Sequence, residues 1–132
     1  MSEDKQWNIQ LRLPAEPEFL GVVRLASAGI AHRLELDHEE SEDLKLVVTE
    51  ACGHLLNLGA QDIEIQWNID GEELDLRVQA MGEIDQEDAD DQADLEWKEI
   101  GLVLINSLMD EVQETKSPPG LRLKKRSLVR DD

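Results

Sequence analysis

Cysteine, aromatic residues and long apolar runs are all scarce in this sequence of 132 residues. A single cysteine, Cys52, excludes an internal disulfide, and its place among apolar residues is typical of a small core side chain. Three tryptophans, one phenylalanine and no tyrosine leave too few rings for a surface that stacks bases. No apolar run is long enough for a signal peptide or a membrane span, so we expect a cytoplasmic protein. The length predicts a single domain over residues 1–132.

Cations are also few. The chain has 13 lysines and arginines against 31 aspartates and glutamates, a formal net charge of −18. Such a surface repels the phosphates of nucleic acids and anionic lipids, and it favours basic partners. We therefore predict no direct nucleic-acid or membrane binding. Solubility or a high-salt habitat would explain the same charge, so the charge alone identifies no ligand.

The apolar pattern predicts an α+β fold. Alternating apolar residues predict strands at 5–13, 62–70, 74–78 and 121–125, and we expect a short strand at 111–116. Apolar residues three and four apart predict helices at 17–34, at 37–59 and from Ile100 onward. Asp37 and Glu40 have the spacing of a capping box, and Asp70-Gly71 that of a hairpin turn. Because helices and strands are grouped, we expect a two-layer sandwich, with three helices on one face of a mixed, mainly antiparallel sheet.

An acidic segment, GEIDQEDADDQADLE, interrupts the apolar pattern at residues 82–96. This composition is typical of a solvated loop. Long loops inside compact domains are uncommon and often cover a binding site, so we expect an acidic lid here.

The second predicted helix carries the candidate chemistry. Glu50, His54 and Asn57 are three or four residues apart, which puts a carboxylate, an imidazole and an amide on one helix face. That face could line a site, or Glu50 and His54 could form an ordinary helix pair. A transition metal held by these two would need a third ligand, for which His32 and His38 are candidates by residue type alone.

Two segments resemble the bacterial anti-sigma factor serine kinases, namely VVRLASAGIAHRLELDHEESEDLKLVVTEAC and IGLVLINSLMDEV. That family belongs to the histidine-kinase-like ATPase superfamily, shared with gyrase, mismatch-repair proteins and sensor histidine kinases. The resemblance covers nearly the whole chain and implies this fold, a Mg-ATP site and protein serine kinase chemistry. The family box E-A-x-x-N supplies a general base and an asparagine that holds Mg²⁺. It stands here as Glu50-Ala51-Cys52-Gly53-His54, so Glu50 is the implied catalytic residue and His54 replaces the asparagine.

The other two ligand boxes of the family are also altered. D-x-G-x-G, whose aspartate binds adenine, matches Ala80-Met81-Gly82-Glu83-Ile84, with Asp85 out of register. G-x-G-L, which caps the phosphates, matches Glu99-Ile100-Gly101-Leu102, and Glu99 adds a negative charge there. The implied cofactor-binding positions are His54, Asn57, Gly82, Asp85, Gly101 and Leu102. Because each lost charged contact costs about 1.5–3 kcal/mol, we predict weakened or lost Mg-ATP binding.

The resemblance implies an anti-sigma regulatory protein that binds a sigma factor, an anti-anti-sigma antagonist of the STAS type, or both. Arg24 matches a position whose arginine contacts partners in the family, and a homodimer is expected. The acidic surface would suit a basic segment of a sigma factor. Two alternatives stay open. One is an active ATP-dependent kinase that phosphorylates a serine of the anti-anti-sigma factor with Glu50 as base, and the other is an acidic adaptor unrelated to transcription.

Overall fold

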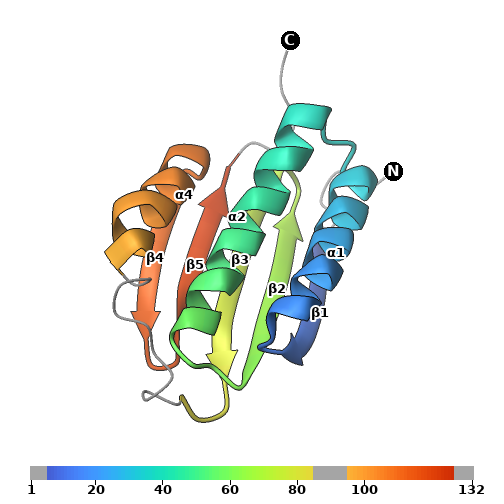
Figure 1. Ribbon diagram of the computed structural model, residues 1–132. Helices are drawn as coiled ribbons and strands as arrows, with labels where there is room; N and C mark the ends of the chain where they lie inside the picture. Colours follow the sequence, from blue (N-terminus) through green and yellow to red (C-terminus); the bar gives the residue numbers. More distant parts are fainter. Residues whose placement is uncertain (1–5, 85–94, 127–132) are drawn as a thin grey trace.

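A computed structural model describes residues 6–84 and 95–126 of the chain, with helices covering one face of a sheet (Figure 1). The elements run in the order β1 (Gln6–Pro14), the 3₁₀ turn η1 (Pro17–Phe19), α1 (Leu20–Arg33), α2 (His38–Asn57), β2 (Asp62–Asp70), β3 (Glu73–Met81), the π-helical turn η3 (Trp97–Gly101), α4 (Leu102–Leu108), β4 (Glu111–Lys116) and β5 (Pro119–Lys125). Within the described ranges, no helix is both long enough and apolar enough to span a membrane.

The five strands form one sheet in the order β1-β2-β3-β5-β4, and all four pairings are antiparallel. The predicted two-layer α+β sandwich is confirmed. The sheet was expected to be mixed, but the described strands contain no parallel pair. The predicted turn between β2 and β3 is also confirmed. Gly71 occupies it with a φ of 63°, a conformation that favours glycine.

The core lies between the sheet and the helices. Alternate residues of the two central strands are buried on the helix side: Ile63, Ile65, Trp67, Leu74, Leu76 and Val78. The stripe of α2 that faces them is also buried: Leu44, Val47, Val48, Ala51, Cys52 and Leu55. The opposite face of the sheet is polar, and Arg122 of β5 donates there to Asp75 of β3 across 2.9 Å. This hydrogen bond raises the pKa of Arg122.

The capping box that begins α2 is present as predicted. The Glu40 amide donates to Asp37 Oδ1 at 2.8 Å, and the Asp37 amide donates to Glu40 Oε1 at 3.3 Å. Two of the amide groups that a helix start leaves unpaired are thereby satisfied. This fixes where α2 begins, and with it which of its residues face the sheet.

The third helix begins earlier than the sequence pattern predicted. Leu95 and Glu96 are already helical, and the π turn η3 joins them to α4. The predictions of a loop as far as Glu96 and of a helix from Ile100 are therefore wrong. A π turn pairs residues five apart, so it breaks the three-and-four spacing by which a helix is recognised. Residues 85–94 of the expected lid lie outside the described residues.

Candidate functional site

A cavity of about 260 Å³ opens between α2 and the helical segment η3–α4, two neighbouring elements of the helix layer (Figure 1). Its lining from α2 is Glu50, Gly53, His54 and Asn57, and its lining from residues 95–108 is Glu96, Trp97, Ile100, Gly101 and Leu104. The helix spacing predicted that Glu50, His54 and Asn57 share a face, and the structure places all three in the wall of this cavity. Gly101 lies opposite them.

The inner part of this cavity is shaped by a stacked aromatic pair. The rings of His54 and Trp97 lie parallel within 10°, with their centroids 4.4 Å apart. Trp97 is 5% exposed, so most of its ring is packed against the protein. A Cβ atom added to Gly101 would overlap ring carbons of Trp97. Gly101 therefore makes room for the tryptophan that stacks on His54.

Trp97 was missed by the sequence analysis, which placed the acidic loop directly before it and the helix after it. One signal could have revealed it. Trp97 and Gly101 are four residues apart, the spacing at which a large side chain covers a small residue on a helix face. In a chain with so few aromatic residues, a tryptophan directly after an apparently solvated loop is itself unusual.

The charged side chains in the cavity wall are all carboxylates. Glu50 and Glu96 line it, and among its described lining residues none is lysine or arginine. Glu99 is exposed and is not part of the lining, so the carboxylate on this side of the cavity comes from Glu96 instead. The wall is therefore suited to a cationic or neutral group more than to an anionic one.

The remaining predicted site residues lie elsewhere. Gly82, with a φ of 83°, packs against the side chain of Gln61, whose Oε1 accepts a hydrogen bond from the Glu83 amide at 3.3 Å. Neither Gly82 nor Leu102 lines the cavity. Asp85 lies outside the described residues.

Arg24 is exposed on α1 and borders a separate hollow between α1 and α2. This hollow of about 410 Å³ is also lined by Leu25, Leu46 and Glu50. Glu50 is thus shared by the two depressions, whereas Arg24 belongs to the surface of the α1–α2 pair.

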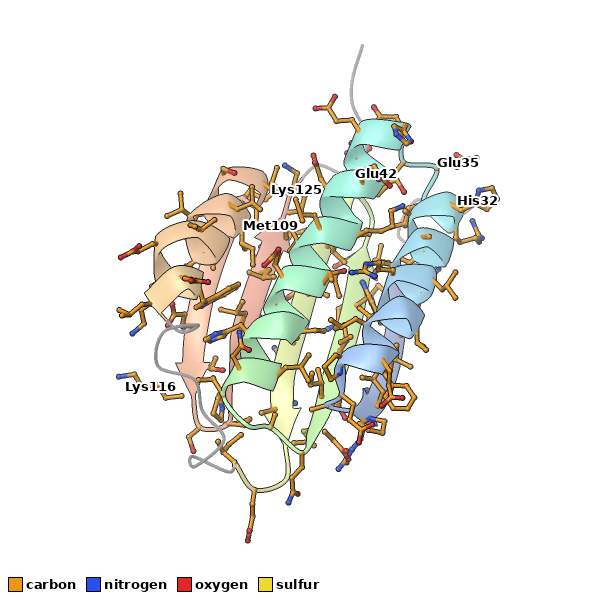
Figure 2. The ribbon with its side chains drawn as sticks, in the orientation of Figure 1. His32, Glu35, Glu42, Met109, Lys116 and Lys125 are labelled. Carbon is orange, nitrogen blue, oxygen red and sulfur yellow. The ribbon has the colours of Figure 1, made fainter. Side chains whose placement is uncertain are left out.

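No group of three or more His, Cys, Asp or Glu side chains in residues 6–84 and 95–126 could hold a metal ion. Neither His32, which points away from α2 near the end of α1 (Figure 2), nor His38 therefore completes a site with Glu50 and His54. Cys52 is fully buried, and burial raises the pKa of its thiol to about 12, so it is a core residue rather than a nucleophile.

The sequence of this chain is similar to that of a known domain family and to several named proteins. Residues 13–125 match the family model described as a histidine kinase-like ATPase domain. Several relatives carry the name serine-protein kinase RsbW. That of Halalkalibacterium halodurans is 34% identical over 131 residues, which is 87% of this chain and 79% of the relative. Those of Bacillus velezensis and Bacillus subtilis are 32% and 31% identical over 123 residues, each covering 80% of this chain and 76% of the relative.

Proposed function

Because the chain belongs to the histidine kinase-like ATPase domain family, as its sequence predicted, we propose that it is an anti-sigma regulatory protein with weakened or lost Mg-ATP binding. It acts by binding a sigma factor, an anti-anti-sigma antagonist of the STAS type, or both. One observation carries this proposal. The chain is similar to serine-protein kinases over most of its length, yet His54 and Trp97 stack on each other inside the cavity.

The lining of the cavity supports the loss of nucleotide binding. The phosphates of ATP would meet two carboxylates, Glu50 and Glu96, without a lysine or arginine among the described lining residues. Mg²⁺ prefers oxygen ligands, and His54 offers an imidazole that is already stacked on Trp97. The cavity of about 260 Å³ is also below the roughly 300–1,000 Å³ of typical ligand pockets. These residues do not fit Mg-ATP.

Partner binding is assigned to the surface around Arg24. Its guanidinium is exposed beside Leu25, which is 76% exposed, and Leu46, which is 37% exposed. An exposed arginine next to apolar side chains has the composition of an interface centre. We assign the chain to a homodimer in solution, as its family resemblance implies.

Nucleotide binding is tested by isothermal titration calorimetry of the purified chain with Mg-ATP. We expect no saturable heat at micromolar nucleotide. His54→Asn is expected to leave this result unchanged, because the carboxylate of Glu96 and the buried Ala80 remain. Micromolar binding by the unmodified chain would refute the loss of nucleotide binding, and tight binding by His54→Asn would show that His54 alone caused it.

Partner binding is tested with sigma factors and STAS antagonists purified from the same genome. We expect one of them to bind, and Arg24→Ala to weaken this binding about tenfold or more. Arg77→Ala is the matched control, because Arg77 is an equally cationic, exposed residue on the sheet face opposite the helices. If no sigma factor or antagonist binds, the proposed function is wrong.

An active kinase is the second candidate, because Glu50 is retained in the cavity wall and the relatives are described as serine-protein kinases. The test is transfer of labelled γ-phosphate from ATP to a serine of the anti-anti-sigma protein. Transfer that disappears in Glu50→Gln would establish this activity and replace the proposal of a nucleotide-independent binder.

A further inference from the structure

The helical segment formed by residues 95–108 is apolar on two sides. Its inner side is buried through Trp97, Gly101 and Ile105. Outside this buried side, Leu95, Ile100 and Val103 are 59%, 67% and 61% exposed. We call these three residues the α4 patch. Large apolar side chains that are exposed together and bordered by polar residues are typical of a protein-protein contact surface, so we treat the α4 patch as a candidate contact surface.

The surroundings of the α4 patch are acidic. Glu96 and Glu99, both exposed, lie on the same helical segment. Ile100 also borders the cavity, whose wall contains Glu50 and Glu96. Lys98 is the single cation between residues 95 and 108. An apolar strip bordered by carboxylates complements a partner that has an apolar strip bordered by cations.

We propose that the α4 patch is a docking surface for an amphipathic helix of a partner protein, with an apolar face that covers Leu95, Ile100 and Val103 and flanking lysines or arginines that approach Glu50, Glu96 and Glu99. This inference rests on the proposed function, because it describes a segment of the regulatory partner. It adds a second contact surface, separate from Arg24 and next to the cavity.

Two other covers fit less well. A second copy docked through the same patch would bring its own Glu96 and Glu99 against those of the first copy, so carboxylates would face carboxylates at this surface. An anionic membrane would be repelled for the same reason. For a basic amphipathic helix, burial of apolar surface and attraction between opposite charges both favour binding.

The test uses designed peptides and the full chain. The probe is a fluorescein-labelled helical peptide of about 18 residues, or five turns, with a leucine stripe and lysines on its polar face. Its twin carries glutamates in place of the lysines. Fluorescence anisotropy is expected to give a Kd of about 10 µM or tighter for the basic peptide, at least about tenfold weaker binding of the acidic twin, and weaker binding at high salt.

Variants then locate the binding surface. Ile100→Ser combined with Val103→Ser is expected to weaken peptide binding about tenfold or more, because both side chains lose their apolar contact with the probe. Ile9→Ser is the matched control. Ile9 is a partly exposed isoleucine on β1, at the sheet edge opposite the one that β4 forms beside α4 (Figure 1). It is expected to bind the peptide as the unmodified chain does, and circular dichroism checks that each variant is folded.

Several results would overturn the inference. Equal binding of the two peptides refutes charge complementarity, and this comparison needs no variant. Undiminished binding by the folded double variant refutes the location. If the double variant loses a dimer that the unmodified chain forms, and the basic peptide does not compete with dimer formation, the α4 patch is a contact with a second copy. The proposed function is judged separately. If the peptide does not bind, binding of a sigma factor or antagonist through Arg24 would still support the proposed function. If neither partner binds, the proposed function is wrong, although the peptide can still bind to the α4 patch.

Discussion

Replacing Gly101 by alanine tests how the cavity is built. In a helix, Gly→Ala normally stabilises the fold by about 0.5–1 kcal/mol, because glycine loses more backbone entropy on folding. The backbone of Gly101 is helical, with φ −63° and ψ −48°, so this gain is available. The new methyl group, however, would overlap the ring of Trp97, a residue that is only 5% exposed. Displacing a packed ring costs about 1–3 kcal/mol. The difference between this cost and the helix gain is about 0–2.5 kcal/mol, so we expect Gly101→Ala to lower the free energy of unfolding by about 1 kcal/mol.

The assay is equilibrium urea unfolding, followed by tryptophan fluorescence and circular dichroism. With a slope of about 2 kcal/mol per molar urea, the expected loss lowers the midpoint by about 0.5 M. Gly29→Ala in α1 is the matched control, because a Cβ atom there would meet nothing within 4 Å. It is expected to raise stability by about 0.5–1 kcal/mol. The two substitutions are thus predicted to change stability in opposite directions.

A double-mutant cycle isolates the cause. In a Trp97→Leu background the ring is absent, so Gly101→Ala should lose its penalty and become neutral or stabilising. If Gly101→Ala stabilises the unmodified chain as much as Gly29→Ala does, Trp97 does not pack on Gly101 and the description of the cavity is wrong.

Two further predictions concern α2. Asp37→Ala removes the capping box and is expected to cost about 0.5–2 kcal/mol in urea unfolding, and an unchanged midpoint would refute the role of the cap. Cys52 should react with a thiol reagent at pH 8 about a thousandfold more slowly in the folded chain than in urea, because burial raises its thiol pKa from 9.0 to about 12. Because the folded pKa lies above the unfolded one, the contribution of the neutral thiol to stability is present below pH 9 and is lost progressively as the pH rises toward 12. Fast labelling of the native chain would show that this part of the core opens.

Local sequence signals predicted the elements whose causes are local. Asp37 and Glu40 specify the start of α2 through hydrogen bonds made within four residues. Gly71 specifies the turn between β2 and β3, and alternation specifies which face of each strand is buried. Glu50, His54 and Asn57 were placed on one face by helix spacing alone.

The features that sequence reasoning missed depend on contacts between distant segments. His54 and Trp97 stack on each other although they are 43 positions apart in the sequence, as their numbers show. The apolar spacing within either helix gives no sign of this contact. The π turn η3 hides the helical period before Ile100, so the acidic composition of the preceding segment dominated the interpretation. Gly82 was placed at the site by alignment to a family box, whereas its environment is set by Gln61.

The position of β1 at the sheet edge has a consequence for the newly made chain. β1 pairs with β2 from Gln6 opposite Asp70 to Pro14 opposite Asp62, so both α1 and α2 must be synthesised before its partner exists. At about 5–20 residues per second, the strand waits for about 3–10 seconds on the ribosome. During that interval Trp7, Ile9, Leu11 and Leu13 form an unpaired apolar strand. Until β2 follows, β1 therefore depends on rapid helix formation or on a chaperone to cover its apolar side chains.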